Sequence, residues 1–275
     1  INFSIIICCY NSEKYIKDTL RSISDQVYSN YEIIIVNDGS EDNTSTLVKE
    51  FIKENNNLSV KYIYIQNNGL ANARNIAVNN SKYEWIAIID HDDIWLKNKL
   101  KIQAEEILRH HSKKLFFSDY LIFGKNINKS RFKIFKEKDN FITHDLNLKT
   151  YNGYINLILH GCFIGSSTVV FSKDIITKIG FFDKQYRFIT DYVFFLKVSK
   201  KFEIHCTNQI LSKWRNHSLQ ASNKLSNIYY HEMFKLYKRF IISNNLNYII
   251  KLKIIKKFIR LIISYIFNKY LYEKK

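Results

Sequence analysis

Four short apolar segments recur along the first 90 residues, and each is rich in β-branched side chains. They are Phe3–Cys9, Tyr31–Asn37, Val60–Ile65 and Trp85–Ile89. Stretches with the helical spacing of apolar positions separate them. The four segments are apolar at consecutive positions, so both faces of each strand are expected to be buried. This pattern predicts an α/β fold, with a mostly parallel twisted sheet flanked by helices.

The pattern after residue 93 is less regular. It predicts a helix over 97–110, a strand over 115–121, a polar stretch and a strand over 167–171. Helices over 173–179 and 191–200 follow, then a strand over 204–211. Two helices over 228–242 and 248–270 complete the chain as a C-terminal helical extension.

Composition narrows the class of protein. The 275 residues are 46% hydrophobic and 24% charged, which is ordinary for a globular protein and excludes a disordered chain. With no proline and 7 glycines, no flexible linker is expected. The four cysteines, Cys8, Cys9, Cys162 and Cys206, lack metal-site spacing, and no signal-peptide pattern precedes them. We therefore expect a reducing, cytoplasmic environment.

The C-terminal segment 246–275 holds +7 of the net charge of +17, because it carries eight Lys and Arg residues against one acid, Glu273. Its helical pattern gives a narrow polar stripe beside a broad apolar face, and the stripe consists of Lys253, Lys256, Lys257, Arg260 and Ser264. Such a helix either packs on the domain or lies on an anionic membrane surface, and the basic stripe favours the membrane. No uncharged apolar run reaches the roughly 18 residues of a spanning helix.

The predicted strand ends carry the candidate chemistry, because ligands of such sheets bind at the carboxyl ends of the strands. The turn after the first strand, CCYNSEKY, has no glycine, which excludes a dinucleotide fingerprint and a P-loop. A phosphate group would then be held by side chains or by a metal.

Three carboxylates follow the fourth strand, in the sequence IIDHDDIW: Asp90, Asp92 and Asp93. They repel one another unless a cation or hydrogen-bond donors neutralise them. Mg2+ and Mn2+ prefer such oxygen ligands and bridge to diphosphates. The alternative is an acidic turn that caps the next helix, which suits Asp93; for Asp90 and Asp92 a functional role is favoured.

The second strand ends at Asp38, which is followed by Gly39. An isolated Asp-Gly pair is ordinary turn chemistry. At this edge of the sheet, however, the carboxylate can accept a ring N–H from a pyrimidine, and Tyr10 can stack on the same base.

Together these motifs resemble family 2 glycosyltransferases, which have the GT-A fold. The resemblance rests on residues 3–44, NNGLANARNIAVNNS and IIDHDDIW, and it continues more loosely to about residue 223. It implies that Tyr10 and Asp38 contact the base, and that Asp90 touches the ribose. It also implies that Asp92 binds Mn2+ or Mg2+.

Two later segments extend the resemblance. FFDKQYRFITDYVFFLKV resembles the segment that carries the catalytic base, which assigns that role to Asp191, with Thr190 in place of the usual Glu. WRNHSLQASN resembles the segment whose Arg and His lie over the diphosphate and metal, here Arg215 and His217. His217 is thus the second expected metal ligand.

Further residues join the nucleotide-sugar site through the same resemblance. Cys8 and Cys9 replace a Pro-Thr pair, so backbone contacts are expected to persist there. Asn11 and His91 belong to the same expected set. Arg74 stands at even odds between a donor contact and tight helix packing.

The sequence therefore predicts an inverting, metal-dependent glycosyltransferase of the hexosyltransferase type. It would move a hexose or N-acetylhexosamine from a UDP-sugar to a glycan or lipid-linked acceptor, in cell-surface polysaccharide or glycoconjugate synthesis. One base and attack from the opposite face predict inversion. We expect no nucleic-acid partner, and a location in the cytoplasm or on the inner face of the cytoplasmic membrane.

The expected organisation is a GT-A domain over 1–223, with a nucleotide-binding half (1–100) and an acceptor half (101–223), followed by a basic extension over 224–275. The alternative is a catalytically degenerate GT-A body that binds membranes or nucleic acid. The pair His205–Cys206 is interpreted as structural, because neighbours in a strand face opposite sides and cannot chelate one ion together. The pair His110–His111 is also interpreted as structural, because it lies near a helix C-terminus, where the helix dipole favours such residues.

Overall fold

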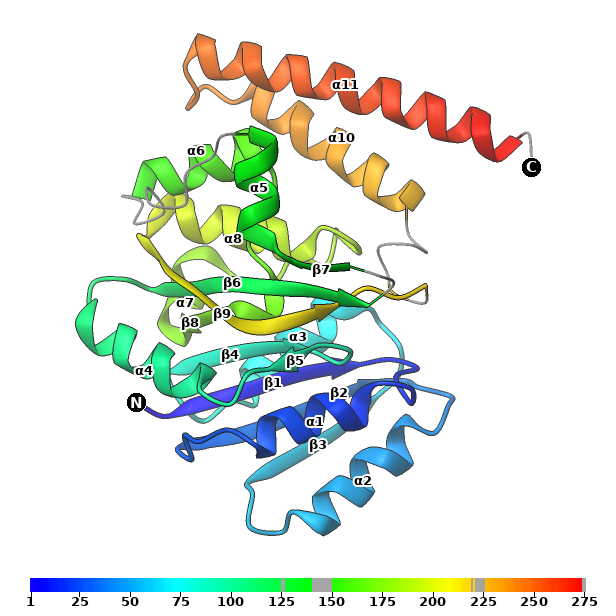
Figure 1. Cartoon of the computed structure of the whole chain (residues 1–275). Coiled ribbons are helices and arrows are strands. Elements are labelled where there is room, and N and C mark those ends of the chain that lie inside the picture. Colours follow the sequence, from blue (N-terminus) through cyan, green and yellow to red (C-terminus); the bar gives the residue numbers. More distant parts are fainter. Residues whose placement is uncertain (125–126, 140–149, 219, 221–225, 274–275) are drawn as a thin grey trace.

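Nine strands form one twisted sheet in the computed structural model, which describes residues 1–124, 127–139, 150–218, 220 and 226–273 (Figure 1). The strands are β1 Phe3–Cys9, β2 Tyr31–Asp38, β3 Val60–Ile65, β4 Trp85–Asp90, β5 Ile94–Trp95, β6 Leu115–Gly124, β7 Ile127–Ser130, β8 Val170–Ser172 and β9 Ile204–Arg215. Their order is β3-β2-β1-β4-β8-β6-β9-β5, and β7 pairs with β6.

The two halves of the sheet differ in strand direction. β3, β2, β1 and β4 are parallel, as the repeated βα pattern predicts. β8 is antiparallel to both β4 and β6, and β6 is parallel to β9. The sheet is therefore parallel over the first 90 residues and mixed beyond them.

Helices cover both faces of the sheet (Figure 1). They are α1 Ile16–Ser24, α2 Thr44–Glu54, α3 Leu70–Asn79, α4 Lys99–Arg109, α5 Arg131–Asp139, α6 Thr150–His160, α7 Ile176–Ile179, α8 Thr190–Lys201, α10 Ser226–Ile242 and α11 Tyr248–Glu273. Two 3-10 turns, Ser166–Thr168 and Lys173–Ile175, flank β8.

Alternate residues of the central strands enter two separate hydrophobic cores. Ile6 of β1 and Ile34 of β2 face a core shared with α3, α6, α8 and α10. Ile5 and Ile33 face the other core, with α1 and α4. This arrangement confirms that the apolar runs of β1, β2 and β4 are strands buried on both faces. β3 differs, because it is the edge strand of the sheet and its residues are only partly buried or exposed.

Most predicted elements are confirmed, and the differences lie beyond residue 93. The strand expected over 167–171 begins as a 3-10 turn, and only Val170–Ser172 pair as β8. The polar stretch contains β7, α5 and α6, which the sequence pattern did not predict. α5 has almost no separation of apolar and polar sides, so its periodicity gave no signal.

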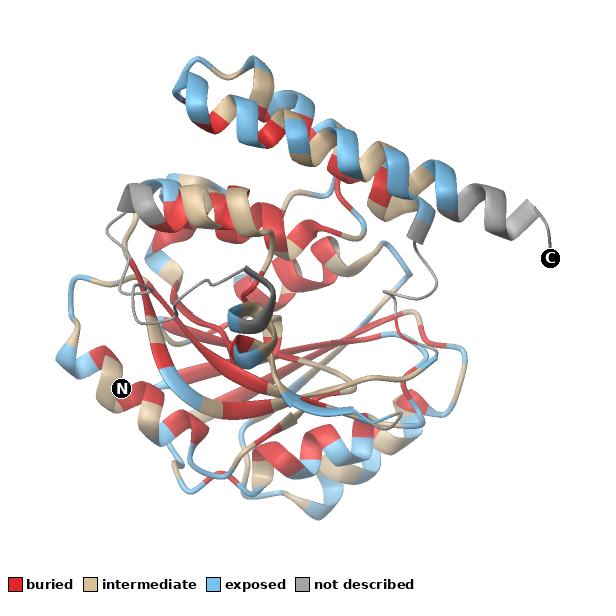
Figure 2. Ribbon diagram, turned by 45° about the horizontal axis from the view of Figure 1, so that its top comes forward, coloured by how far each residue is buried: buried red, intermediate tan, exposed pale blue. Residues whose placement is uncertain are grey.

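The C-terminal helices form a hairpin on the α6 side of the sheet (Figure 2). Met233, Leu236 and Phe240 of α10 are buried in the same core as α6 and α8, and α11 adds Ile250 and Ile254. Within the part of the chain that the structure describes, no helix is both long and apolar enough to cross a bilayer. The expected boundary at residue 223 lies outside the described residues.

Candidate active site

The carboxyl ends of β1, β2 and β4 lie side by side, because these strands are parallel neighbours. Tyr10, Asp38 and Asp90 therefore meet at one edge of the sheet. Arg215, the last residue of β9, reaches this edge from the mixed half, where its Nε donates to the backbone carbonyl of Asp92, 2.9 Å away. The fold thus gathers predicted residues from distant parts of the chain.

Asp92 and His217 form a pair, although 125 positions separate them. Nε2 of His217 lies 2.8 Å from Oδ2 of Asp92, and both side chains are largely buried. The ring of Tyr15 packs against His217 with centroids 4.5 Å apart. A carboxylate oxygen and an imidazole nitrogen that converge in this way can hold a divalent cation between them. The donor set fits the expected metal.

Arg74 joins two carboxylates in the interior. Its guanidinium is 1% exposed; Nη2 donates to Oδ1 of Asp90 at 2.8 Å, and Nη1 pairs with Oδ1 of Asp191. Oδ2 of Asp191 accepts from the hydroxyl of Ser166 at 2.8 Å. A buried guanidinium needs such partners, because an unpaired buried charge is costly. Arg74 therefore links the end of β4 to the start of α8.

Asp191 lies in the first turn of α8, where the helix dipole favours a carboxylate. The residue before it, Thr190, is buried, and its hydroxyl has no hydrogen-bond partner within the described residues. The position of the usual Glu is thus filled by a small side chain, while Asp191 keeps its own contacts.

Glu232 of α10 holds the turn that leads into α8. Its Oε1 accepts from the backbone N–H of Arg187 at 2.6 Å, and Oε2 accepts from Phe188 and Ile189 at 3.0 Å each. No sequence motif identifies Glu232. The available signal was an acidic side chain next to buried Met233 in an otherwise apolar stripe.

Asp38 is fixed at the end of β2 by two backbone amides. Its Oδ1 accepts from Asn68 at 2.8 Å and its Oδ2 from Gly69 at 2.9 Å, just before α3 begins. Each carboxylate oxygen can accept a second hydrogen bond. Asp38 is therefore held in place and keeps acceptor capacity.

Tyr10 and Asn11 follow β1 with different environments. Tyr10 is 46% exposed, so its ring is accessible for stacking. Asn11 has a left-handed backbone with φ of 47°; its N–H donates to Oγ of Ser40 at 2.9 Å, and its Oδ1 accepts from the Glu41 N–H at 3.0 Å. Asn11 thus ties the loop after β1 to the loop after β2.

Cys8 and His91 meet through the backbone. Nδ1 of His91 lies 3.2 Å from the carbonyl oxygen of Cys8. The Cys8 side chain is in the core, and burial raises the pKa of its thiol. Any contact of Cys8 with a ligand at this edge would therefore come from its backbone.

Asp93 does not form the helix cap proposed as an alternative, since α4 begins at Lys99. Its Oδ1 accepts from the Arg215 N–H at 3.0 Å, and its Oδ2 from the Ser167 hydroxyl at 2.5 Å. Burial raises the pKa of the Asp93 carboxyl well above its usual range, and the negative charge of Asp92 is a second, smaller cause of this increase. Asp93 connects the turn after β4 to β9 and the 3-10 turn.

The side chain of Arg215 lies along the same turn. Its Nη2 donates to Oδ2 of Asp18 at 2.9 Å, and its guanidinium lies 4.7 Å from the centre of the Tyr15 ring. With its Nε on the Asp92 carbonyl, the guanidinium is fixed close to the Asp92–His217 pair. A positive charge is thus available where a diphosphate would meet a metal.

The edge combines three chemical functions. Asp92 and His217 can hold a divalent ion; Arg215 brings a cation to the same turn; and Asp191, held by Arg74, offers a carboxylate near the end of β4. A metal ion and cations stabilise a leaving diphosphate, and a positioned carboxylate can take a proton from an acceptor hydroxyl.

Comparison with known proteins identifies the class. Residues 4–180 match the family model "Glycosyl transferase family 2", so the chain belongs to glycosyltransferase family 2, a family of transferases. The chain is 31% identical over 228 residues to the Escherichia coli UDP-Glc:alpha-D-GlcNAc-diphosphoundecaprenol beta-1,3-glucosyltransferase WfgD. The aligned region covers 82% of this chain and 81% of that protein.

Solved structures confirm the GT-A fold. Staphylococcus aureus TarS 1–349 in complex with UDP-GlcNAc matches with a TM-score of 0.70 at 20% identity, over 96% of this chain and 73% of that one. The mannosyltransferase PcManGT from Pyrobaculum calidifontis, in complex with GDP-Man and Mn2+, matches with a TM-score of 0.65 at 13% identity, over 94% of this chain and 69% of that one.

Several curated relatives are much longer than this chain. The chain spans 31% to 36% of the length of three Rickettsia proteins named uncharacterized glycosyltransferases, from R. conorii, R. felis and R. bellii.

Proposed function

We propose that this protein is an inverting, metal-dependent glycosyltransferase that moves a sugar from a UDP-sugar to a glycan or lipid-linked acceptor in cell-surface polysaccharide synthesis. The observation that carries the proposal is the Arg74 bridge. It joins Asp90, at the donor edge of the sheet, to Asp191, the candidate base on α8. This pair of contacts supports one site that contains both the donor edge and the candidate base.

The donor would lie along the loops that follow β1, β2 and β4. Tyr10 would stack on the uracil base of the donor. Asp38 would accept a hydrogen bond from the ring N–H of the uracil while its carboxylate still accepts from the backbone amides of Asn68 and Gly69. Asp90 meets the ribose. The remaining proposed donor contacts are Cys8 through its backbone, Asn11, Arg74, His91 and Arg215.

Asp92 and His217 would hold Mn2+ or Mg2+. The 2.8 Å distance between Nε2 of His217 and Oδ2 of Asp92 supports this assignment, and the structure of PcManGT is a complex with GDP-Man and Mn2+. The bound ion supplies Lewis-acid stabilisation of charge on the leaving diphosphate. Arg215 adds a second positive charge on the same turn.

Asp191 would act as the base toward the acceptor hydroxyl. One carboxylate oxygen pairs with Arg74 and the other with Ser166, which fixes the direction of the carboxylate. The proton moves from the acceptor hydroxyl to a carboxylate oxygen as the sugar–oxygen bond forms. Attack from the face opposite the leaving diphosphate inverts the anomeric carbon.

The test is the Asp191→Asn variant, which keeps the size of the side chain and removes the base. We measure UDP release from UDP-glucose and UDP-N-acetylglucosamine with lipid-linked glycan acceptors. Transfer should fall by a factor of about 100 to 10,000, while UDP affinity stays within about twofold. The control is Asp183→Asn, which makes the same change at an aspartate that precedes α8. Wild-type transfer by Asp191→Asn would exclude this residue as the base.

The same protein would bind the inner face of the cytoplasmic membrane through α11. Its buried residues Ile250 and Ile254 face the domain, as one of the two interpretations expects. Other apolar residues of α11 are exposed, among them Ile259 and Ile263. They alternate along the helix with the exposed basic residues Lys253, Lys256 and Arg260. An exposed surface that is both apolar and basic suits the interface of an anionic bilayer.

Vesicle flotation tests the membrane proposal. The protein should float with vesicles that contain phosphatidylglycerol and remain unbound with phosphatidylcholine alone, and the double variant Ile259→Asp/Ile263→Asp should lose flotation. Lys61→Asp, on exposed β3, is the control for a change of charge. Equal flotation of both variants would place the membrane contact elsewhere.

A further inference from the structure

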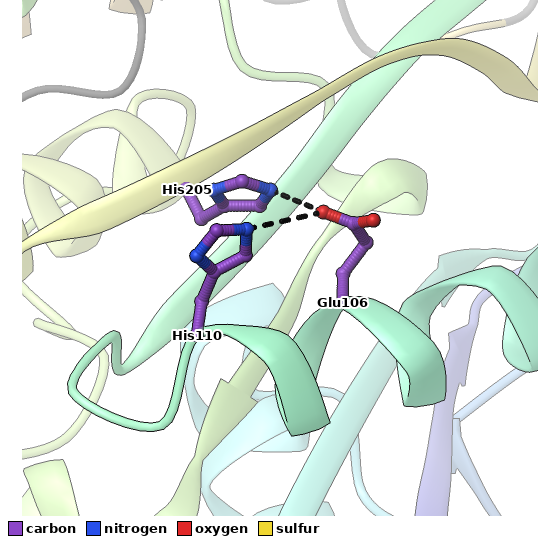
Figure 3. Close-up of side chains that lie close together, drawn as sticks. All are labelled: Glu106, His110 and His205. Atoms are coloured by element: carbon purple, nitrogen blue, oxygen red, sulfur yellow. Dashed lines mark hydrogen bonds and ion pairs between the residues drawn. The ribbon is translucent and has the colours of Figure 1, made fainter.

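Three potential metal ligands converge between α4 and β9, at a place that the donor site does not use (Figure 3). Glu106 and His110 are one helical turn apart on α4, and His205 is the second residue of β9. Oε2 of Glu106 lies 2.6 Å from Nε2 of His205 and 3.7 Å from Nε2 of His110. One ligand atom from each residue lies within 4.8 Å of the other two.

This cluster is remote from the donor edge. His205 lies at the start of β9, whereas Arg215 lies at its end, ten residues further along an extended strand. β9 is bulged between them, and their partners on β6, Phe116 and Phe123, are seven residues apart, so at about 3.3 Å per residue the two ends are roughly 23 Å apart. Ion binding at one end is therefore chemically independent of nucleotide binding at the other.

The hydrogen bond between Glu106 and His205 does not explain the position of His110. The His110 ring stacks on His205 with centroids 4.1 Å apart, and its Nε2 is beyond hydrogen-bond distance of the carboxylate. Figure 3 shows both imidazole rings turning a nitrogen toward the same oxygen. This convergence is what a shared cation between the three atoms would require.

The two ring nitrogens of His205 differ in their surroundings. Nδ1 is buried without a hydrogen-bond partner in the described residues, whereas Nε2 faces the carboxylate of Glu106. The nearby cation Lys113 is neutralised by an ion pair with Glu203.

The surroundings also orient the carboxylate and give access. Oε1 of Glu106 accepts from Nη1 of Arg109 at 2.8 Å, which leaves Oε2 for the cluster. Such outer hydrogen bonds commonly hold metal-binding carboxylates in place. The His205 side chain is 5% exposed and that of His110 38% exposed, so an ion and a water molecule can enter from the His110 side.

We propose that Glu106, His110 and His205 bind one Zn2+ ion, with a water molecule as the fourth ligand. Two imidazoles and one carboxylate are an established zinc ligand set, and zinc accepts the tetrahedral arrangement. With metal–ligand bonds of about 2.1 Å in a tetrahedral site, ligand atoms are about 3.4 Å apart. Zinc binding would therefore lengthen the distance from Oε2 of Glu106 to Nε2 of His205, now 2.6 Å, and shorten the distance to Nε2 of His110, now 3.7 Å. The ion clamps the end of α4 to the start of β9.

Along the chain, His110 is adjacent to His111 and His205 is adjacent to Cys206. Cys206 packs against the opposite core, as the strand alternation predicts, and His111 is exposed. The cluster instead joins residues that are 99 positions apart. Spacing along the chain gave no indication of this contact.

The experiment is calorimetric titration of Zn2+ into the chelator-treated full chain without nucleotide, followed by Co2+ absorption spectroscopy. Wild type should bind one Zn2+ at this cluster, and Co2+ should give the intense visible bands of a tetrahedral site. His110→Ala and Glu106→Gln should each weaken Zn2+ binding at least about 100-fold. His111→Ala is the matched control, and Asp92→Asn removes any contribution of the donor site.

Thermal denaturation without metal verifies that each variant is folded. His110 is at the surface, so its variant should unfold like wild type in chelator while losing the stabilisation by Zn2+. The proposal is overturned if folded wild type fails to bind Zn2+ at submillimolar concentration. It is equally overturned if His110→Ala and Glu106→Gln bind Zn2+ as His111→Ala does.

Discussion

Glu232 connects the C-terminal helices to the candidate base, and replacing it gives a sharp prediction. Its carboxylate is 8% exposed and accepts three backbone hydrogen bonds from residues 187–189, immediately before the helix that carries Asp191. Glu232→Gln keeps the shape of the side chain. It removes the charge and turns one acceptor oxygen into an N–H2 group that faces a backbone N–H.

The magnitude follows from these contacts. A hydrogen bond to a charged group contributes about 1.5 to 3 kcal/mol, and Glu232→Gln loses at least one such bond. We expect unfolding free energy to fall by about 1.5 to 3 kcal/mol, which lowers Tm by about 3 to 10 °C for a domain of this size. Glu232→Ala leaves three amides without this acceptor and should lose about 3 kcal/mol or more.

The assay combines denaturant unfolding with transfer kinetics. Because the turn before α8 positions Asp191, kcat should fall about tenfold or more in Glu232→Gln at a temperature where the variant is fully folded. UDP affinity should be unchanged, since the hydrogen bonds of the Glu232 carboxylate within the described residues go to residues 187–189 rather than to the donor loops. The exposed Glu54→Gln variant on α2 is the matched control. Identical stability and kcat in both variants would refute the reasoning.

Further predictions concern the interior and the loops. Lys99 is fully buried, with Nζ 4.1 Å from the centre of the Trp95 ring, and burial lowers its pKa well below its usual range. Its Nζ also donates to the buried Oε1 of Gln103. The unfolded chain then binds more protons up to about pH 10.4, so wild-type stability rises with pH through this window. Urea unfolding should show a smaller rise between pH 7.5 and pH 9.5 for Lys99→Met than for wild type, and equal rises would contradict this. Arg74→Lys loses the planar fork that joins two carboxylates and should reduce kcat about 100-fold in the UDP-release assay; unchanged kcat would deny the bridge a role. Gly39→Ala places a Cβ 2.7 Å from the backbone nitrogen of Asn67 at φ of +76°, and calorimetric scanning should show a loss of about 2 kcal/mol or more; a Tm equal to wild type would contradict this strain.

The first 93 residues were predictable because β1, β2 and β4 are buried on both faces and the helices between the strands are regularly spaced. The parallel connections then bring Tyr10, Asp38 and Asp90 to one edge by topology alone. The positions of Arg215 and His217 came from the resemblance rather than from periodicity, and the structure places His217 against Asp92. The catalytic and binding roles of these residues stay predictions.

The rest of the structure depends on contacts between distant parts of the chain. β8 has only three residues, too few for a clear pattern. Arg74 was ambiguous because its partners, Asp90 and Asp191, lie on different elements, 16 and 117 positions away. Glu232 was missed for a related reason, since its partners are backbone amides that no side-chain motif reports.

The central claim is that the edge of the sheet formed by β1, β2 and β4 binds a UDP-sugar with a divalent ion at Asp92 and His217. The most direct measurement is calorimetric titration of UDP into the full chain, once with Mn2+ and once with EDTA, for wild type and for Asp92→Asn. The account predicts that wild type binds UDP with Mn2+ at least about tenfold more tightly than with EDTA, and that Asp92→Asn loses this difference. Equal UDP binding by wild type with Mn2+ and with EDTA, or no binding of UDP at all, would contradict it.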